Sequence, residues 1–546
     1  MSFLKKLFIA LTRAERKTLI IAVAVAVLSA ALAIGTFVVV ATKAVPAAGG
    51  SFTEGMVGQP EYVNPVTAQT EADRALVKLI YSNLPSIADS IQTSSDGKTW
   101  TVRLKPDLRW QDGQKLTSDD VIFTVQSIQN PDANSPLAAA WQGVAVSRTS
   151  ELELTFSLAN PYAFFSTNLD NLYITPKHLF ADVPPGNWHF SEYNLKPIGS
   201  GSYEASSYDQ RGNGFITKYH LVAWDGALHK ALIQNFDIAF FPNQDDAIKG
   251  FNTAQIDGLA VSPDDIASLN RPTDIFSWRT PSYYAVFLNQ GANAALADPA
   301  ARLALSLAID RTQIENDALG SYGKPTWGPV PPDAPYYAAF MTTSSRDAAA
   351  AALQAGGWQL NDSGVPQKTI QKATTTLNFT LTVPDIPFLV KTAQELQASW
   401  QSIGAQIAIA TDTPENIAQN QVTNRSYDAI LYGNALGPNS DLYAFWDSAE
   451  RFAPGMNLAL YHNPADDALM ASIRTTMSDA SRTAMFAKLE SDIASSNSAL
   501  FLYSPDYLYV TAHNVRGIDT SAPLVDPADR FNQIPQWYLN TTRVLK

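Results

Sequence analysis

Residues 96–128 read DGKTWTVRLKPDLRWQDGQKLTSDDVIFTVQSI and carry more structural information than any other segment. Residues 100–104 (WTVRL) alternate apolar and polar side chains with a period of two, as a half-buried strand does. Glycine-containing turns follow, and Thr117 then precedes an apolar-periodic segment as a helix N-cap, with Asp119 and Asp120 in the first turn. The stretch therefore predicts a strand, two turns and a helix. Capping explains the two aspartates better than a catalytic carboxylate pair does.

Both periodicities recur along the rest of the chain, which predicts an α/β fold. Residues 151–158 alternate like a half-buried strand, and residues 283–288 (YYAVFL) are typical of a more fully buried one. Asp298 and Pro299 supply the N-cap and the first-turn proline of a helix. Residues 346–355 form an alanine-rich helical segment that stops at a glycine pair, a common C-cap signal.

The length and the charge of the chain bound its function. The 546 residues exceed what one hydrophobic core holds, so two or three packed lobes are expected. The net charge is −13, and the part after residue 43, with 32 basic and 50 acidic residues, carries −18 without a basic stripe. Such a polyanionic body excludes nucleic acid as a partner. The absence of cysteine excludes disulfides, thiolate metal sites, cysteine nucleophiles and a lipidated N-terminal cysteine.

The N-terminus predicts a membrane anchor. Residues 18–42 are uncharged over 25 positions, enough to cross a bilayer as a helix. Five basic residues precede this stretch, so the positive-inside rule leaves residues 1–17 in the cytoplasm and exports the body. A cleavable signal has an apolar region of only about 7–15 residues, so an uncleaved single-pass anchor is favoured. The alternative is cleavage near Val45, Pro46 and Ala47. Residues 43–50 (KAVPAAGG) are expected to be a short flexible linker.

The sequence shows no catalytic or metal-binding constellation. The six histidines never stand at H-x-x-x-H spacing, and neither a G-x-S-x-G elbow nor a glycine-rich phosphate loop occurs. Residues 95–98 and 321–324 match S-x-x-K, but both lie at glycine-containing turns without a following K-T-G. We therefore expect no enzymatic activity, no cofactor and no metal.

Residues 96–128 closely resemble the signature of the family 5 extracellular solute-binding proteins, the oligopeptide-, dipeptide- and nickel-binding group of ABC importers. Six further features resemble the family pattern in the same order along the chain. They are residues 62–65 with 79–84, 197–203, 287–289 with 302–311, 328–331, 355–358 and 427–433. Each motif is unspecific alone, whereas seven in order cover almost the whole exported body.

The resemblance implies a two-lobed periplasmic-binding-protein-like clamp of type II, behind one transmembrane helix. Lobe I is expected at residues 51–282, with an extra subdomain inserted at about 85–190. Lobe II is expected at residues 283–503, and residues 504–546 are expected to return to lobe I. The ligand is then expected in the interlobe cleft, where hinge closure buries it.

The resemblance also implies ligand-binding residues. In the peptide-binding members two segments pair with the ligand backbone like neighbouring strands. The matching positions in this chain are Gln69, Thr70, Glu71 and Ala72, then Gly433, Asn434, Ala435 and Leu436. For the first segment an ordinary helix N-cap is the alternative. Gly437 stands where peptide binders often place an aspartate for the ligand's ammonium, and Asp441 is the nearest substitute.

The implied function is that of an extracytoplasmic substrate-binding component of an ABC importer. It would capture a peptide or peptide-like ligand, deliver it to the permease and ATPase subunits, and act as a monomer. One alternative is a membrane-anchored sensor that uses the same clamp, and another is an exported hydrolase. The scaffold does not choose among peptides, nickel complexes, opines and sugars.

Overall fold

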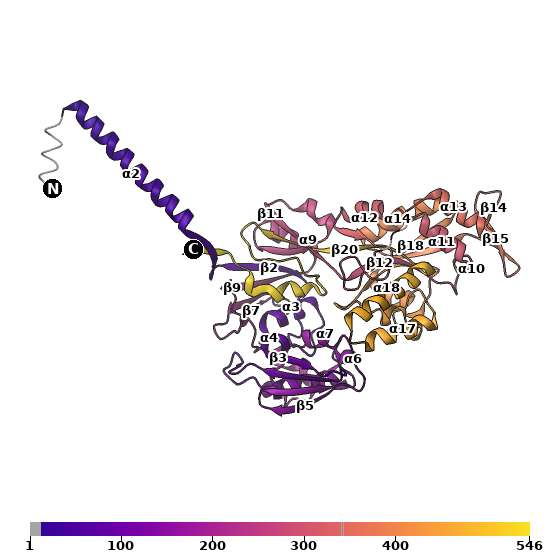
Figure 1. Cartoon of the computed structure of the whole chain (residues 1–546), viewed down its shortest axis with the longest axis horizontal. Coiled ribbons are helices and arrows are strands. Elements are labelled where there is room, and N and C mark those ends of the chain that lie inside the picture. Colours follow the sequence, from indigo (N-terminus) through magenta and orange to yellow (C-terminus); the bar gives the residue numbers. More distant parts are fainter. Residues whose placement is uncertain (1–11, 340, 342) are drawn as a thin grey trace.

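The computed structural model describes residues 12–339, 341 and 343–546. Figure 1 shows a long helix, α2 (Arg13–Ala41), that projects from an elongated body of strands and helices. The other helices of eight or more residues in this described part are α3 (Glu71–Ile80), α5 (Ser118–Gln129), α9 (Gln244–Asn252), α11 (Pro299–Leu307), α12 (Arg311–Leu319), α13 (Arg346–Ala355), α14 (Pro387–Gln401), α17 (Pro464–Thr475) and α18 (Asp479–Ser496).

A mixed 12-stranded sheet runs through the body in the order β18-β17-β19-β12-β20-β10-β2-β9-β8-β7, and β11 and β13 also pair with β20. Its strands are β2 (Ser51–Val57), β7 (Tyr203–Gln210), β8 (Ile216–Ala223), β9 (Asn235–Phe241), β10 (Gly258–Val261), β11 (Thr273–Arg279), β12 (Ser282–Leu288), β13 (Gly323–Pro325), β17 (Asn378–Pro384), β18 (Gln406–Asp412), β19 (Ala429–Ala435) and β20 (Ala499–Ala512).

The long strand β20 joins two halves of this sheet. Its first residues, 499–503, pair with β12, and residues 506–512 pair with β11. The chain crosses a second time between β11 and β12. We call the half with β2 and β7–β11 lobe I, and the half with β12, β13 and β17–β19 lobe II. The expected boundaries, at 282/283 and 503/504, lie at these crossings and stay predictions.

The two crossings are bonded to each other. The Arg279 guanidinium pairs with the Asp506 carboxylate at 2.6 Å (Nη1 to Oδ1), and the Thr280 hydroxyl donates to the Pro505 carbonyl at 2.7 Å. Two adjacent crossing strands form a narrow connection of the kind about which lobes can rotate.

Lobe II is a sheet covered on both faces, as strand alternation requires. On β12, Val286 and Leu288 pack with residues of α11–α14. Ala285 and Phe287 face the opposite side, where residues of α17 and α18 cover them. The expected buried strand at 283–288 is confirmed, because both of its faces are buried.

The local signals in the sequence position the helices as expected. Thr117 is the N-cap of α5, and the Asp120 carboxylate accepts the Thr117 N–H at 2.8 Å, which completes a capping box. Asp298 caps α11, with Pro299 as its first residue. The alanine-rich helix α13 has the expected bounds.

The inserted subdomain is built on a four-stranded antiparallel sheet, β3 (Ala88–Thr93), β4 (Thr99–Leu104), β6 (Glu153–Ser157) and β5 (Ala145–Ser150). It touches lobe II directly. The Ala163 N–H donates to the Arg474 carbonyl at 2.8 Å, and Phe164 is buried among lobe II side chains. Gly97, at the β3–β4 turn, lies against Met477, whose Sδ is 2.7 Å from where a Cβ would stand.

The segment after α2 differs from the expected flexible linker. Residues 42–47 form strand β1 (Thr42–Ala47), which pairs antiparallel with β21 (Asn540–Leu545) over six positions. The flexible linker at 43–50 is therefore wrong for residues 43–47, because the C-terminal strand supplies hydrogen-bond partners that local composition does not reveal.

The N-terminal helix has the properties of a membrane span. Residues 13–37 of α2 are long and apolar enough to cross a membrane, and the body buries none of the most apolar window of this stretch. The expected span at 18–42 thus lies within α2 up to Ala41. Residues 1–11 of the expected cytoplasmic tail lie outside the described residues.

Candidate ligand-binding site

Strand β19 has an open edge at its carboxyl end. On one side β12 pairs with it along its whole length, from Ala429 to Ala435. On the other side β17 pairs only with Ala429 and Ile430 and ends at Pro384. Because proline has no N–H, it cannot extend the ladder. Residues 433–435 therefore have a strand neighbour on one side only.

The hydrogen-bond alternation shows which backbone groups face that edge. The Leu436 N–H donates to the Pro281 carbonyl at 2.7 Å, and the Asn289 N–H donates to the Asp428 carbonyl at 2.8 Å. In an antiparallel pair, bonded positions alternate with positions that point outward. Gly433 and Ala435 consequently direct their N–H and C=O groups away from β12. This edge can accept one more extended backbone.

The side chains of the same segment have structural roles. A Cβ on Gly433 would lie 2.8 Å from the Tyr284 ring, so packing requires glycine at this position. The buried Asn434 amide donates to the Tyr283 hydroxyl at 2.9 Å. Leu436 is also buried. Of the second predicted segment, Gly433 and Ala435 thus direct backbone groups away from β12, whereas the side chains of Asn434 and Leu436 are buried. Contact of a ligand with this segment stays a prediction.

The first predicted segment is a helix start. Thr70 is the N-cap of α3, with its hydroxyl accepting the Asp73 N–H at 3.0 Å. Because this capping box makes Glu71 and Ala72 helical, their pairing with a ligand like a neighbouring strand is wrong, and the helix-cap alternative describes the segment. Gln69 is exposed ahead of the helix, and Ala72 is buried. Contact of a ligand with Gln69 or Glu71 stays a prediction.

Glu71 belongs to an ion-pair network with a buried arginine. Arg530 lies on the 3-10 segment η7 (Pro527–Gln536) and reaches Glu71 at 3.2 Å and the buried Glu54 at 2.8 Å. The Tyr509 hydroxyl donates to the second oxygen of Glu54 at 2.5 Å. Burial raises the pKa of Glu54, and Arg530 opposes that rise. Glu71, with 39% of its side chain exposed, is the accessible carboxylate of the network.

Asp441, the nearest substitute for the missing aspartate, is already paired with a cation of the chain. Its Oδ2 lies 3.2 Å from the Arg474 Nε, and its Oδ1 accepts the Tyr443 N–H at 3.1 Å. Burial raises the pKa of Asp441, and the charge of Arg474 counters that effect. Gly437 is half-buried in the loop between β19 and Asp441, where it offers no side chain to a ligand.

Both predicted segments border the hinge. The Arg530 guanidinium, which holds Glu71, lies 5.8 Å from the centre of the Tyr507 ring, and Tyr507 pairs with Trp278. Ser282, four residues after Trp278 in the sequence, pairs with Ala435 of the second predicted segment. Four residues of chain span at most about 14 Å. No hydrogen bond or ion pair between described residues joins the two segments directly, but the crossing strand lies beside both.

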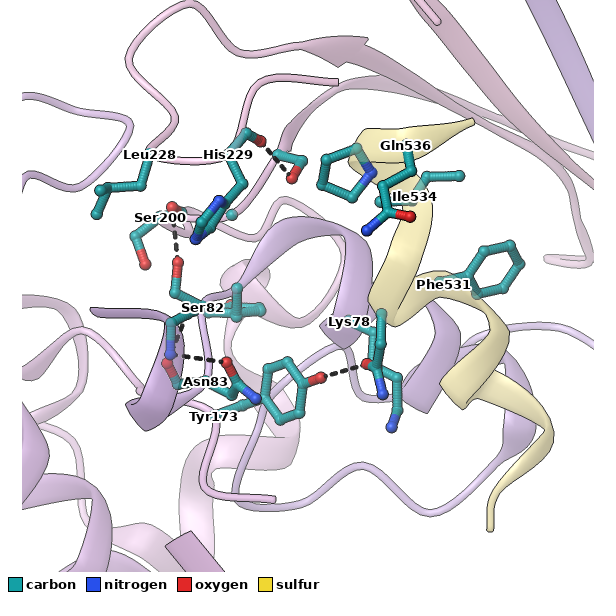
Figure 2. Close-up of a pocket in the computed structure, with 16 residues that line it drawn as sticks. Lys78, Ser82, Asn83, Tyr173, Ser200, Leu228, His229, Phe531, Ile534 and Gln536 are labelled. Atoms are coloured by element: carbon teal, nitrogen blue, oxygen red, sulfur yellow. Dashed lines mark hydrogen bonds between the residues drawn. The ribbon is translucent and has the colours of Figure 1, made fainter. Parts of the chain in front are cut away.

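A cavity of about 450 Å³ lies elsewhere, in lobe I. Figure 2 shows it between α3, the loop at residues 228–229 and η7. Two of its polar side chains have partners within the chain. The Ser82 hydroxyl donates to the Ser200 carbonyl at 2.8 Å, and the Tyr173 hydroxyl donates to the Asn532 side chain at 2.9 Å. None of the predicted ligand-binding residues lines this cavity, so we do not assign the ligand to it.

Residues 84–452 match the family described as bacterial extracellular solute-binding proteins, family 5, middle region. The match covers more than half of the chain. The chain belongs to this family. Its members are substrate-binding proteins and not enzymes. Within the described residues, no group of three or more His, Cys, Asp or Glu side chains is arranged to hold a metal ion.

Curated relatives agree with this assignment over most of the chain. Protein XP55 of Streptomyces lividans is 25% identical over 461 residues, which cover 82% of this chain and 80% of the relative. The oligopeptide-binding protein AppA of Bacillus subtilis is 23% identical over 515 residues, which cover 90% and 92%.

Solved structures show the same fold. The ABC transporter substrate-binding protein CtaP of Listeria monocytogenes superimposes with a TM-score of 0.79 at 24% identity, over 90% of this chain and 99% of that one. Bacillus subtilis AppA, solved in complex with a nonapeptide, gives a TM-score of 0.70 at 22% identity, over 91% and 100%. The two-lobed periplasmic-binding-protein-like fold expected from the sequence is confirmed.

Sequence reasoning missed the basic partners of the site. Arg474 and Arg530 lie outside every motif of the family pattern, and their partners Asp441 and Glu54 are distant in sequence or buried. Residue spacing gives no signal for such pairs. Only the fold brings them together.

Proposed function

We propose that this protein is the extracytoplasmic substrate-binding component of an ABC importer and captures a peptide or peptide-like ligand between its lobes. The observation that carries the proposal is the open edge of β19, where Gly433 and Ala435 present backbone N–H and C=O groups. An edge of this kind binds main chain through backbone hydrogen bonds, which do not depend on the ligand's side chains. The names of two relatives, an oligopeptide-binding and a dipeptide-binding protein, support a peptide as the ligand.

The position of that edge supports capture by closure. Ala435 pairs with Ser282, directly after the crossing between the lobes. A ligand strand on this edge lies near the hinge, where rotation of lobe I covers it and removes it from water. Burial of the apolar surface of the ligand then stabilises the closed form.

The apolar helix α2 supports a membrane-anchored location for this component. The body buries none of the most apolar window of this helix. We propose that α2 remains as a single-pass anchor, that the body lies on the extracytoplasmic side, and that the monomer delivers its ligand to permease and ATPase subunits.

The test is peptide binding by the full chain with one backbone donor removed. Ala435→Pro removes an outward-facing N–H without breaking a β12 bond, because residue 435 occupies a non-bonded pair. Ala435→Ser keeps the N–H and serves as the control. We expect the proline variant to raise the peptide Kd roughly 5- to 30-fold, equivalent to about 1–2 kcal/mol for a lost hydrogen bond.

Isothermal titration calorimetry with a set of short peptides measures this difference, and circular dichroism checks that both variants fold. Equal affinity of the proline and serine variants would show that the β19 edge does not bind the ligand backbone. Absence of binding by the wild type to any peptide would reject the peptide as ligand.

A further inference from the structure

The Arg474 guanidinium lies over two aromatic rings. Its guanidinium carbon lies 4.5 Å from the centre of the Tyr443 ring and 5.3 Å from the centre of the Tyr162 ring. The Asp441 carboxylate meets its Nε at 3.2 Å. Tyr162 comes from the inserted subdomain, whereas Arg474, Tyr443 and Asp441 come from lobe II. Such stacking and ion pairing fix the plane of a guanidinium before any ligand arrives.

The terminal nitrogens of Arg474 differ from those of other arginines in lobe II. The terminal nitrogens of Arg482 donate hydrogen bonds to the Thr476 carbonyl and to the Asp479 carboxylate. Those of Arg425 donate to two backbone carbonyls. In the described part of the chain, no backbone carbonyl or second carboxylate accepts a hydrogen bond from Nη1 or Nη2 of Arg474. Arg474 also shares a side-chain hydrogen bond with the Tyr162 hydroxyl, a neutral partner that a second anion can displace.

A cavity of about 300 Å³ lies beside this arginine. Arg474 and Tyr162 line it together with the amide side chains of Gln142, Asn160 and Asn168. The cavity lies between the subdomain and lobe II, at the place where the Ala163 N–H bonds the Arg474 carbonyl. A ligand group that enters it meets amide groups and one fixed cation.

We propose that Arg474 binds a carboxylate group of the ligand. A guanidinium presents paired N–H donors whose geometry matches the two oxygens of a carboxylate. Asp441 pairs with Arg474 at Nε and acts as a positioning residue. The chain contains a precedent, because Arg530 holds the two carboxylates of Glu54 and Glu71 at once. The inference rests on the proposed function, since it adds a carboxylate requirement to the peptide ligand.

Two sources can supply this carboxylate, the C-terminus of a peptide or an acidic side chain. Three matched peptides separate them: one with a free C-terminus, the same peptide amidated, and the amidated peptide with one glutamate added. Calorimetry on the full chain compares wild type with Arg474→Gln and Arg474→Lys. Arg346→Gln removes the same charge from the lobe II surface and is the control.

We expect amidation to weaken wild-type binding at least tenfold. Arg474→Gln should weaken the free acid by a similar factor and leave the amide unchanged, while Arg346→Gln changes neither. Recovery of affinity by the added glutamate would assign the carboxylate to a side chain, and no recovery would assign it to the C-terminus. Arg474→Lys keeps the charge but loses the fork, so an intermediate affinity is expected.

Equal wild-type affinity for the free acid, the amide and the glutamate peptide would overturn this inference and leave the proposed function standing. Failure of the wild type to bind any of the three would overturn the proposed function and the inference with it. If Arg474→Gln does not fold, Arg474→Lys tests the same assignment, and an undiminished preference for the free acid in that variant would overturn it.

Discussion

Glu490, on α18, is a buried carboxyl group that accepts a single hydrogen bond from described residues. Its side chain is fully shielded, its Oε2 accepts the Ala338 N–H at 3.2 Å, and its Oε1 has no partner among described residues. Burial raises the pKa of Glu490 to about 8, and the Ala338 hydrogen bond opposes the rise. At neutral pH this side chain is therefore protonated in the folded protein.

The sign of the resulting pH dependence follows from linkage. Between the unfolded pKa of about 4.3 and the folded pKa, the folded state holds a proton that the unfolded state has lost. Stability consequently falls as pH rises through this window, by up to about 1.4 kcal/mol per pH unit. We expect Glu490→Gln to reduce this loss of stability. Urea unfolding at pH 5 and pH 8 measures the free energy of unfolding at both ends of the window. Glu415→Gln, an exposed control, should leave the loss unchanged, and an identical pH profile for Glu490→Gln would contradict the assignment.

At the residue scale, local chemistry was predictable and distant pairing was not. Thr117 and Asp298 predict the starts of their helices, because an N-cap side chain accepts a hydrogen bond from a backbone N–H within three residues. Glu71 shows that such local rules do not predict a distant partner. Its helical position follows from the same local rule, but its partner Arg530 lies 459 residues away.

At the element scale, the C-terminal segment η7 and its N-cap are bound to α3 by ion pairs. Arg74 pairs with Asp526 at 2.7 Å, Lys78 pairs with Asp529, and Arg530 pairs with Glu71. Arg530 also neutralises the buried carboxylate behind this contact. These pairs hold η7 against α3, close to the sheet of lobe I.

We expect Arg530→Met to lower the free energy of unfolding by about 3–5 kcal/mol, because it leaves Glu54 buried without a counter-charge. Adding Glu54→Gln should recover part of that loss. Lys488→Met, which removes an exposed pair with Asp492, should cost less than about 1 kcal/mol. Urea unfolding followed by tryptophan fluorescence measures all three, and a loss in Arg530→Met no larger than in Lys488→Met would contradict the role given to this network.

The pairing of β1 with β21 could not be predicted from the sequence. Composition around residue 45 favours a flexible linker, and nothing in it indicates a partner at residue 542. Strand existence was predictable where alternation was strong, as for β4 and β6, and where an apolar run was continuous, as for β12. Which strands pair was not, since pairing depends on the whole chain.

At the scale of the whole molecule, the anchor has a direct consequence. The apolar span of α2 should keep the intact protein in the membrane fraction after washing with high salt, because about 20 apolar residues hold a helix in a bilayer. Membrane fractionation with N-terminal sequencing measures this. A soluble mature chain that begins near residue 48 would contradict it.

Ligand binding is expected to close the two lobes about the hinge. The chain has no cysteine, so Ser95→Cys on the subdomain and Ala484→Cys on α18 accept spin labels selectively, and both positions are exposed. Double electron–electron resonance on the full chain then measures the distance between the subdomain and lobe II. With saturating peptide we expect one short, narrow distance population, and without peptide an additional longer one. Identical distributions in both states, with a peptide that calorimetry shows to be bound, would contradict closure of the lobes by the ligand.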